Sequence, residues 1–369
     1  MRVLHVASGR LYGGIERMLV TLAEAAGGPF EFEFAVAAPG RLAAELRDGG
    51  AIVHALGDVR LSRPATVWLA RRRLEALLDR AGFDVVLCHA PWAYAIFAPV
   101  PRRKGIRVGW WQHDRATGRP LVERWARATP ADLVISNSEW TATSARTVQP
   151  RARVTVVYCP VSMPSPATAD RATTRAALGA RPGDVVILSA SRMESWKGHR
   201  ELLTAAASLP RDARWVLWMA GAAQRPHEVE YQALLARDVS KLGLDGRIRW
   251  LGERRDVPAL MRAADLLCQP NVTAEPFGIV FAEALACGLP VLTTDMGGAR
   301  EIVDASCGRL VSPSDSQALA AALTEMVLDG SLRMRLAAAG PARAASRCAV
   351  PSVMRTLHAA LADTDTVAA

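Results

Sequence analysis

The chain has 369 residues, half of them hydrophobic and 22% charged, so it holds enough apolar material for about two domains and is not expected to be disordered. No run approaches the roughly 18 consecutive apolar residues of a membrane-spanning helix, and the apolar stretch at residues 1–7 is too short for a signal peptide. The six cysteines are scattered without a C-x-x-C pair, which argues against a disulfide framework and a structural zinc site and favours the cytoplasm.

The formal net charge of +9 is distributed unevenly. Residues 1–165 hold 22 Lys+Arg against 14 Asp+Glu, a net +8, and the remaining residues hold 23 against 22, a net +1. A basic first half would suit an anionic acceptor or a membrane surface. The alternative is an arginine-rich composition, since only three of the 45 basic residues are lysine. No compact motif interleaves basic residues with stacking aromatics, so we expect no nucleic-acid binding.

The first half alternates short apolar runs with stretches of helical periodicity. We expect strands at 2–7, 31–37, 51–56, 83–89, 106–111, 131–136 and 153–158. Strands that alternate with helices are typical of a parallel sheet with helices on both faces. Ligands of such sheets bind beyond the carboxyl ends of the strands.

A glycine pair follows the first expected strand. Gly13 and Gly14 allow a close backbone approach and begin a helix whose N-terminus suits an anion. Taken alone, a paired glycine is more often only a turn.

Residues 66–82 form a predicted amphipathic helix with three consecutive arginines, Arg71, Arg72 and Arg73. The simpler interpretation is a solvated face. The alternative is contact with an anionic membrane or acceptor.

His113 follows the strand expected at 106–111, where a ligand would bind. A lone histidine is more often structural than functional, and Asp114 beside it would either orient the ring or cap the next segment. The residues alone leave both roles open.

The composition changes between residues 158 and 168, where three prolines within seven residues indicate a linker. The alternation then resumes, with strands expected at 184–191, 213–220, 247–251, 265–269 and 290–294. Two such halves predict two domains, at 1–162 and 168–348, with a cleft between them.

Arg192 and Lys197 follow the strand at 184–191 and precede a helix that begins near His199. Two cations at that point would neutralise a diphosphate. The alternative is a loop with ordinary surface charges, although Lys197 is one of only three lysines in the chain.

The segment 274–301 holds the densest group of candidate site residues. Pro276 suits the first helical position, so we expect a helix that begins there, with Glu275 at its cap, and that stops at Gly288. A short strand and a glycine turn at 297–298 follow, before another short helix.

Glu275 and Glu283 are eight residues apart, which on one helix places them about 12 Å apart and within about 80° around the axis. Between them, Phe277, Gly278 and Ile279 would expose backbone N–H groups that suit a phosphate. A nucleotide sugar fits, with its sugar at Glu275, its diphosphate at the helix end and its ribose at Glu283. The alternative is an amphipathic helix with two solvated glutamates, which the apolar neighbours of Glu283 disfavour.

The same segment resembles a known family. Its pattern E-P-F-G-x-V-x-x-E-A-x-A-C-G-x-P-V, followed by T-D-x-G-G and E-I-V, is similar to that of the retaining glycosyltransferases of family 4. The resemblance implies the GT-B fold, an α/β architecture of two Rossmann-like parallel-sheet domains that face a central cleft. It also implies that a final segment, about 349–369, crosses back onto the first, acceptor-side domain. The pattern departs at Arg300, where these enzymes often carry proline in a turn.

Other motifs extend the resemblance. R-x4-K-G, at Arg192 and Lys197, is similar to the motif with which the family binds the nucleotide diphosphate. G-G-x-E-R, at Gly13 and Gly14, is similar to a loop near the donor phosphate and the acceptor. The resemblance further implies that His113 contacts the donor sugar and that the loop at Gly252 approaches the nucleobase.

We therefore expect a retaining glycosyltransferase, of hexosyltransferase type, that moves a glycosyl group from a nucleoside-diphosphate sugar to a hydroxyl acceptor. Arg192, Lys197 and the helix end at 277–279 would stabilise the departing diphosphate. Glu275 would hold the sugar and Glu283 the ribose. The resemblance favours UDP over GDP, and it implies a reaction on one face of the sugar in which the leaving phosphate takes the acceptor proton.

Two rival functions stay open, a GT-B sugar-nucleotide epimerase and a non-catalytic nucleotide-sugar-binding subunit of a synthase. We expect no cofactor and no metal, because the only D-x-D sequence is Asp363–Asp365, in a tail. The sequence leaves the acceptor open between a glycan, a glycolipid and a natural-product intermediate. The expected location is the cytoplasm, with a weak peripheral contact of the basic first domain at the inner membrane face.

Overall fold

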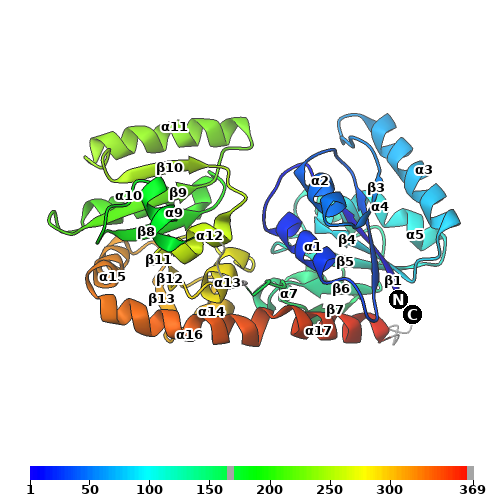
Figure 1. Cartoon of the computed structure of the whole chain (residues 1–369). Helices are drawn as coiled ribbons and strands as arrows, with labels where there is room; N and C mark the ends of the chain where they lie inside the picture. Colours follow the sequence, from blue (N-terminus) through cyan, green and yellow to red (C-terminus); the bar gives the residue numbers. More distant parts are fainter. Residues whose placement is uncertain (164–169, 364–369) are drawn as a thin grey trace. The chain divides into compact units, whose positions relative to one another are not determined.

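The computed structural model describes residues 1–163 and 170–363, which form two compact units (Figure 1). One unit comprises Met1–Pro160 and the last helix, α17 (Val350–Ala362), and the other comprises Val161–Ala349. Of the predicted linker, residues 164–168 lie outside the described residues. Each unit is built around its own sheet.

The first unit holds a seven-stranded sheet in the order β3-β2-β1-β4-β5-β6-β7, and every neighbouring pair is parallel. The expected strands of the first half are all present, with ends that differ by at most two residues from the prediction. The strands are β1 (Arg2–Ala7), β2 (Glu31–Val36), β3 (Ile52–Ala55), β4 (Val85–His89), β5 (Arg107–Gln112), β6 (Leu133–Ser136) and β7 (Arg153–Val156).

Helices cover both faces of this sheet (Figure 1). On one face, Val6, Cys88 and Trp110 pack in an apolar core with residues of α3 and α4. Because side chains alternate along a strand, their neighbours His5 and His89 point to the opposite face. The helices of this unit before α17 are α1 (Gly14–Glu24), α2 (Arg41–Asp48), α3 (Pro64–Arg80), α4 (Ala90–Phe97), α5 (Pro99–Arg103), α6 (Leu121–Ala126), α7 (Glu139–Ala142) and α8 (Ala145–Val148).

Two of the three consecutive arginines of α3 bind backbone carbonyls. Arg71 donates through Nε to the carbonyl of Ile96 at 2.7 Å. Arg73 donates through Nη1 to the carbonyl of Leu56 at 3.1 Å. Arg72, by contrast, has 65% of its side-chain surface exposed. The solvated face that the sequence suggested therefore describes Arg72 and Arg73, which are exposed, but not Arg71, which is only half-exposed. Arg71 and Arg73 also hold α3 against neighbouring segments.

The second unit holds a six-stranded parallel sheet in the order β10-β9-β8-β11-β12-β13. Its last strand was not predicted, because four residues between a turn and a proline carry little periodicity of their own. The strands are β8 (Val185–Ala190), β9 (Trp215–Ala220), β10 (Ile248–Gly252), β11 (Leu266–Gln269), β12 (Val291–Thr294) and β13 (Gly308–Val311).

Helices also flank the second sheet. α13 and α16 pack closely, since a Cβ atom at Gly340 would lie 2.9 Å from the carbonyl oxygen of Leu285. Both units are thus Rossmann-like α/β structures, as the sequence predicted. The helices are α9 (Arg171–Ala177), the short 3-10 helix η1 (Ser195–Lys197), α10 (His199–Ala207), α11 (Pro226–Lys241), α12 (Val257–Ala263), α13 (Ile279–Ala286), α14 (Ala299–Ile302), α15 (Ser316–Leu328) and α16 (Gly330–Cys348).

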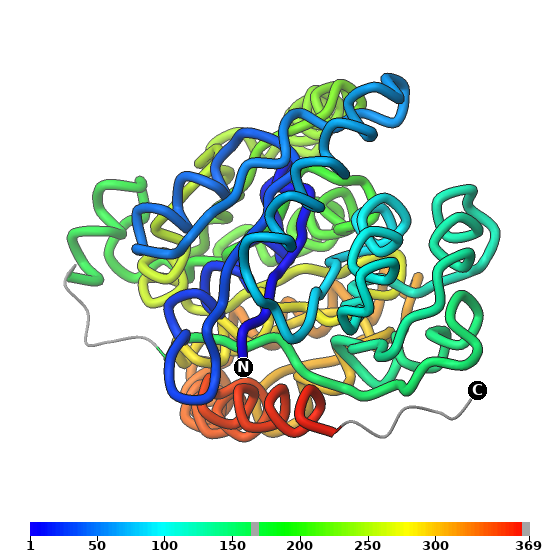
Figure 2. The backbone as a smooth tube through the Cα atoms, turned by 90° about the vertical axis from the view of Figure 1, so that its right-hand side faces the viewer, coloured from blue at the N-terminus to red at the C-terminus, as the bar shows by residue number. Residues whose placement is uncertain are grey.

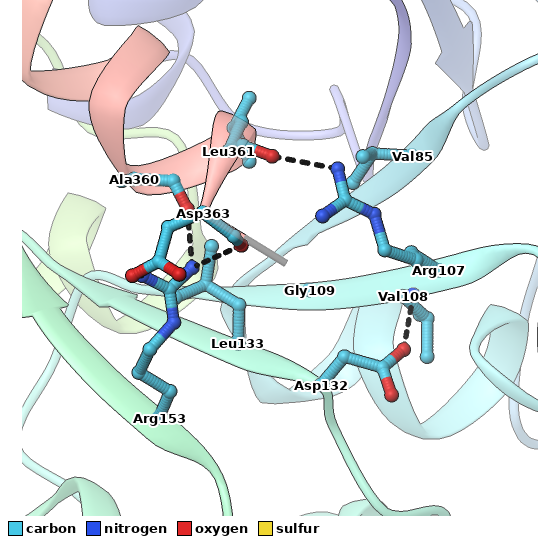
Figure 3. Close-up of a pocket in the computed structure, with 10 residues that line it drawn as sticks. All are labelled: Val85, Arg107, Val108, Gly109, Asp132, Leu133, Arg153, Ala360, Leu361 and Asp363. Atoms are coloured by element: carbon cyan, nitrogen blue, oxygen red, sulfur yellow. Dashed lines mark hydrogen bonds and ion pairs between the residues drawn. The ribbon is translucent and has the colours of Figure 1, made fainter. Parts of the chain in front are cut away.

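α17 packs against the first sheet where β5 and β7 begin. Arg107, at the start of β5, donates through Nη2 to the carbonyl of Leu361 at 2.6 Å (Figure 3). Arg153, at the start of β7, donates to the carbonyl of Ala360 and to the carboxylate of Asp363, the latter at 2.6 Å. The two guanidinium groups bind carbonyls that the last turn of a helix leaves without helical partners.

The same helix lies beside the start of the chain. The rings of Phe30 and His358 meet edge to face, with centroids 5.5 Å apart, and Figure 2 shows the N-terminal segment next to α17. Of the D-x-D sequence, Asp363 takes part in the contact with Arg153, whereas Thr364 and Asp365 lie outside the described residues. The small pocket in Figure 3 is bordered by these paired polar groups, so it belongs to the packing of α17.

Replacing both Arg107 and Arg153 by alanine is expected to loosen α17, because hydrogen bonds from charged donors contribute about 1.5–3 kcal/mol each. Hydrogen exchange of the amides at 353–361, followed by mass spectrometry, should then accelerate at least about tenfold. Arg72→Ala, on the exposed surface of α3, is the control. Equal exchange in the double variant and the control would contradict the docking role.

Candidate functional site

Loops at the carboxyl edge of the second sheet press against one another. Gly198, with a φ of 75°, lies where a Cβ atom would stand 1.9 Å from the carbonyl oxygen of Pro270. The N–H of Val272 donates to the carbonyl of Trp196 at 2.9 Å. The loop after β8 is therefore held against the loop after β11, and side chains that follow these two strands can meet.

Lys197 and Glu275 form an ion pair at this edge. The Lys197 Nζ lies 2.8 Å from the Glu275 Oε2, and the side-chain amide of Asn271 donates to the same oxygen at 2.7 Å. The Gln269 amide in turn donates to the Asn271 side-chain oxygen at 3.1 Å. The Lys197 and Glu275 side chains are only 14% and 12% exposed, so water screens their attraction weakly. Two residues that the sequence assigned to different parts of a ligand are thus in direct contact.

The helix expected from Pro276 begins later in the structure. α13 begins at Ile279, and Gly278 before it has a φ of 89°, which a right-handed helix does not accommodate. The prediction that Glu275 caps this helix is therefore wrong. The predicted separation of about 12 Å between Glu275 and Glu283 was calculated for one continuous helix, so it does not apply to this structure.

The glycine turn after β12 holds the segment before α13 outside the helix. The N–H of Gly298 donates to the carbonyl of Glu275 at 2.8 Å. A Cβ atom at Gly297 would lie 2.3 Å from that carbonyl oxygen, and one at Gly298 would lie 2.5 Å from the carbonyl oxygen of Pro276. The backbone of Glu275 is therefore bonded to a neighbouring turn, and its side chain reaches Lys197.

The helix-terminal N–H groups that the sequence expected at residues 277–279 lie farther along in the structure, at the start of α13. The first N–H groups of a helix have no partner within it, and in α13 these belong to Ile279 and Val280. Both residues are half-exposed, whereas Phe277 and Gly278 are buried. Glu283 lies within α13, half-exposed and flanked by buried alanines.

Arg192 is paired with two carboxylates of its own unit. Its Nη2 lies 2.6 Å from Glu194 Oε1, and its Nη1 lies 3.4 Å from Glu228 Oε1. Glu228 is fully buried, and its second oxygen accepts the N–H of Gln224 at 2.6 Å. A guanidinium carries five N–H donors, so these contacts leave donors for a phosphate. Sequence reasoning missed Glu228 because it comes from α11, far along the chain.

The ends of the neighbouring strands are tied together at Gly252. This residue ends β10 with a φ of 64°, and its carbonyl accepts the N–H of Gly221 at 2.7 Å. A Cβ atom at Gly221 would lie 1.8 Å from the carbonyl oxygen of Ser191. The ends of β8, β9 and β10 therefore lie together, with Gly252 half-exposed among them.

In the first unit, the glycine pair begins α1 as expected. The N–H of Gly13, however, donates to the side chain of Glu16 at 3.0 Å, and Glu16 is 9% exposed. This carboxylate already occupies the positive end of the helix, as in a capping box. The simple expectation of an anion site at Gly13 and Gly14 therefore needs correction, because a phosphate there would meet a like charge.

His113, just beyond β5, belongs to a row of three buried histidines. Its Nε2 lies 3.0 Å from Nδ1 of His89, and Nε2 of His89 lies 3.0 Å from Nδ1 of His5. The exposed fractions are 5%, 2% and 0% for His113, His89 and His5. Sequence reasoning missed His5 and His89, because the strand order that brings β1, β4 and β5 together cannot be derived from spacing.

Burial keeps these three imidazoles neutral. It lowers the pKa of His5 and of His113 to about 3. The pKa of His89 is held well below its usual value, by burial first and then by the two neighbouring histidines. The rings are stacked rather than convergent, and within residues 1–163 and 170–363 no three His, Cys, Asp or Glu side chains are grouped to hold a metal ion. At neutral pH, His113 is therefore a neutral hydrogen-bonding group.

These pKa values predict a loss of stability in acid. The unfolded chain takes up protons on these histidines near pH 6.5, whereas in the folded chain His5 and His113 resist protonation until about pH 3 and the pKa of His89 is also well below 6.5. The free energy of unfolding therefore falls as the pH falls below 6.5, by up to about 1.4 kcal/mol per pH unit for each histidine. Urea unfolding of the whole protein at pH 6.5, 5.5 and 4.5 measures how the free energy of unfolding changes with pH.

His5→Phe should flatten the slope by roughly one histidine's share of about 1.4 kcal/mol per pH unit. His227→Gln, at an exposed position of α11, is the control. An identical slope in wild type and His5→Phe would mean that His5 does not resist protonation in the folded state.

Two family models match consecutive parts of the chain. The model described as Glycosyltransferase Family 4 matches residues 12–163, and the model described as Glycosyl transferases group 1 matches residues 170–343. Together these matches extend over most of both units.

Curated relatives match over shorter stretches. A D-inositol 3-phosphate glycosyltransferase of Xylanimonas cellulosilytica is 39% identical over 188 residues, which is 50% of this chain and 43% of that protein. A phosphatidyl-myo-inositol mannosyltransferase of Mycobacterium leprae is 45% identical over 101 residues, which is 27% of each. The chain thus spans less than half the length of these relatives.

Solved structures match along nearly the whole chain. Anabaena Alr3699/HepE in complex with UDP-glucose has a TM-score of 0.86 and 25% identity, covering 98% of this chain and 99% of that one. A sucrose-phosphate synthase from Thermosynechococcus elongatus, with a TM-score of 0.82, 19% identity and coverage of 98% and 99%, shares the fold. The two family models and the paired Rossmann-like units lead to one conclusion: the chain belongs to the family 4 glycosyltransferases of the GT-B fold.

Proposed function

We propose that this chain is a retaining glycosyltransferase that moves a glycosyl group from a UDP-sugar to a hydroxyl acceptor. The observation that carries this proposal is the Lys197–Glu275 pair in the loops beside α13. A fixed cation, a carboxylate and helix-terminal N–H groups come from one edge of one sheet. A sugar diphosphate requires these groups, for its negative charge and for its hydroxyls.

Glu275 is suited to hold sugar hydroxyls. Its Oε2 accepts hydrogen bonds from Lys197 and from Asn271. Its Oε1 has no hydrogen-bond partner in the part of the chain that the structure describes. An ionised carboxylate accepts hydrogen bonds on both oxygens, so Oε1 can receive hydroxyl groups. The Lys197 ammonium, with three donors, keeps hydrogens for a phosphate oxygen while it holds Glu275.

The chemical step breaks the bond between the anomeric carbon and the leaving diphosphate and forms a bond from that carbon to the acceptor oxygen. The acceptor proton passes to the leaving phosphate oxygen, on the same face of the sugar. Lys197, the remaining donors of Arg192 and the start of α13 stabilise the negative charge that develops on the diphosphate. Because Lys197 and Asn271 already bind Glu275, we assign this carboxylate to positioning rather than to covalent attack.

The other candidate residues complete the donor site. Glu283 receives the ribose hydroxyls, Gly252 lies against the nucleobase, and His113 donates to or accepts from the sugar as a neutral group. UDP is favoured over GDP because the Anabaena structure of 25% identity is a complex with UDP-glucose. Since Glu16 occupies the N-terminus of α1, we assign Gly13 and Gly14 to the acceptor rather than to the donor phosphate.

Exposed apolar residues support contact with a lipid-linked acceptor. On α3, Trp68 is 65% exposed and Leu69 is 43% exposed, close in sequence to the exposed Arg72. This combination suits the headgroup region of an anionic membrane. Within the described residues, no helix has the length and apolar character that crossing a membrane requires. We therefore propose a peripheral contact through α3.

Lys197→Ala tests the assigned charge directly. We expect the turnover number for UDP release from a UDP-sugar to fall about 100-fold or more, because removal of one charge-stabilising group has such effects elsewhere. Donor hydrolysis, followed as nucleotide release, needs no knowledge of the acceptor. Lys241→Ala, at the exposed end of α11, is the matched control. Equal turnover in both variants would remove Lys197 from the mechanism.

Analysis of the products in the same assay separates the rival functions. An epimerase would change the sugar while it remains a nucleotide sugar. A non-catalytic subunit would bind the nucleotide sugar and return it unchanged, with any acceptor or with water.

A further inference from the structure

The three buried histidines of the first unit lie in a diagonal row across three neighbouring strands. In the strand register, His5 of β1 pairs with Leu87 of β4, and His89 of β4 pairs with Trp111 of β5. Each histidine therefore lies two residues farther along than the partner of the one before it. Residues two apart share a face of the sheet, so the row runs toward the carboxyl edge, where His113 ends it.

The rings of the row are held firmly. The His5 and His89 rings stack with centroids 5.2 Å apart, and the His89 and His113 rings stack with centroids 5.3 Å apart. Trp111 stacks on His89 at 5.2 Å and on His113 at 6.1 Å. A ring that is stacked and hydrogen-bonded at once has little freedom to flip.

Hydrogen bonding couples the protons of the three rings. A neutral imidazole has one N–H donor and one acceptor nitrogen. His89 uses both nitrogens within the row, so it donates to one neighbour and accepts from the other. Only two arrangements keep both hydrogen bonds: every ring carries its proton on Nδ1, or every ring carries it on Nε2. The tautomer of His113 is thus linked to that of His5.

The buried end of the row decides between the two arrangements. His5 Nε2 has no hydrogen-bond partner among the residues that the structure describes, and the rings of Phe32 and Phe34 lie 4.8 Å and 5.3 Å from the His5 ring. A proton on this nitrogen would be a donor without an acceptor. Orphaned buried N–H groups are rarer in proteins than orphaned acceptors. The arrangement with every proton on Nδ1 is therefore favoured.

We propose that His5 and His89 are positioning residues that lock His113 as an Nδ1–H hydrogen-bond donor. The Nε2 of His113 is occupied by His89, so Nδ1 is the ring nitrogen left for a ligand. A donor at that point suits an oxygen acceptor, such as a hydroxyl of the transferred sugar. The identity of this ligand rests on the proposed function, whereas the lock does not.

The row is a lock rather than a proton channel. A proton that entered at His113 would have to leave at His5, where no protein group among the described residues receives it. His113 therefore does not serve as a general base through this row. Its contribution is the direction and the donor character of one N–H group.

Nuclear magnetic resonance of the whole protein, labelled with 15N in histidine, tests the lock without any substrate. Two-bond proton–nitrogen spectra at pH 7 distinguish the Nδ1–H tautomer, the Nε2–H tautomer and the imidazolium. We expect His5, His89 and His113 to be neutral, with the proton on Nδ1. A proton on Nε2 of His113, or a charged ring at pH 7, would overturn the proposal.

Variants at the far end of the row test the coupling. His5→Phe removes the partner of His89, and we expect the His113 signals to move toward a mixture of tautomers. His5→Asn places an amide N–H near the position of the histidine Nδ1, so it can still donate to His89 and should restore the Nδ1–H signals. His54→Gln, outside the row on β3, is the control and should leave His113 unchanged. If His5→Phe does not fold, the wild-type spectrum and the spectrum of His5→Asn still test the proposal.

Donor hydrolysis by the same variants separates this proposal from the proposed function. We expect His5→Phe to lower kcat about tenfold with little change in KM, and His5→Asn to recover most of the lost kcat. An Nδ1–H lock in a protein that does not turn over any UDP-sugar would support the lock and contradict the proposed function. If the protein turns over a UDP-sugar while His113 carries its proton on Nε2, the lock is contradicted and the proposed function is not.

Discussion

The site in the second unit depends on how closely backbone can approach backbone at the carboxyl edge of the sheet. At Gly198 and at Gly297, a Cβ atom would lie 1.9 Å and 2.3 Å from the carbonyl oxygens of Pro270 and Glu275. Since no larger residue fits there without displacement of a loop, these contacts fix the loops that carry Lys197 and Glu275. The ion pair is therefore set by backbone packing, and the side chains need little reorganisation when a ligand arrives.

The candidate polar groups of the two units differ in charge: those of the second unit are ionised, and the histidines of the row in the first unit are neutral. The second unit keeps a charged pair, partly shielded, beside the start of a helix, which suits the charge of a departing diphosphate. The first unit removes His5, His89 and His113 from water, which lowers the pKa of His113 to about 3 and leaves it neutral. A neutral donor suits a hydroxyl, because it binds the oxygen without pulling a proton from it. In the proposed reaction, the charged groups of the second unit therefore act on the leaving diphosphate, and the neutral His113 acts on a sugar hydroxyl.

The sequence predicted well what depends on local periodicity and poorly what depends on strand order. Apart from β13, the strands of both sheets were expected with ends within two residues of those observed, because apolar runs between turns define them. The start of α13 was misplaced, because Pro276 signals a helix locally while the turn at Gly298 holds the same backbone from another part of the chain. The contact between Lys197 and Glu275, and the row from His5 to His113, require knowledge of which strands are neighbours. Motif spacing carries no such information.

Thermal unfolding with UDP, GDP, ADP and TDP is the most direct test of a nucleotide-sugar site, with Glu283→Ala alongside and Glu230→Ala, at an exposed position of α11, as the control. A nucleotide at 100 times its Kd stabilises the folded protein by about 2.7 kcal/mol, which shifts the midpoint visibly. We predict that UDP raises the midpoint of wild type and of Glu230→Ala, and that Glu283→Ala loses this shift. No shift with any nucleotide, nor with intact UDP- and GDP-sugars, would contradict the account.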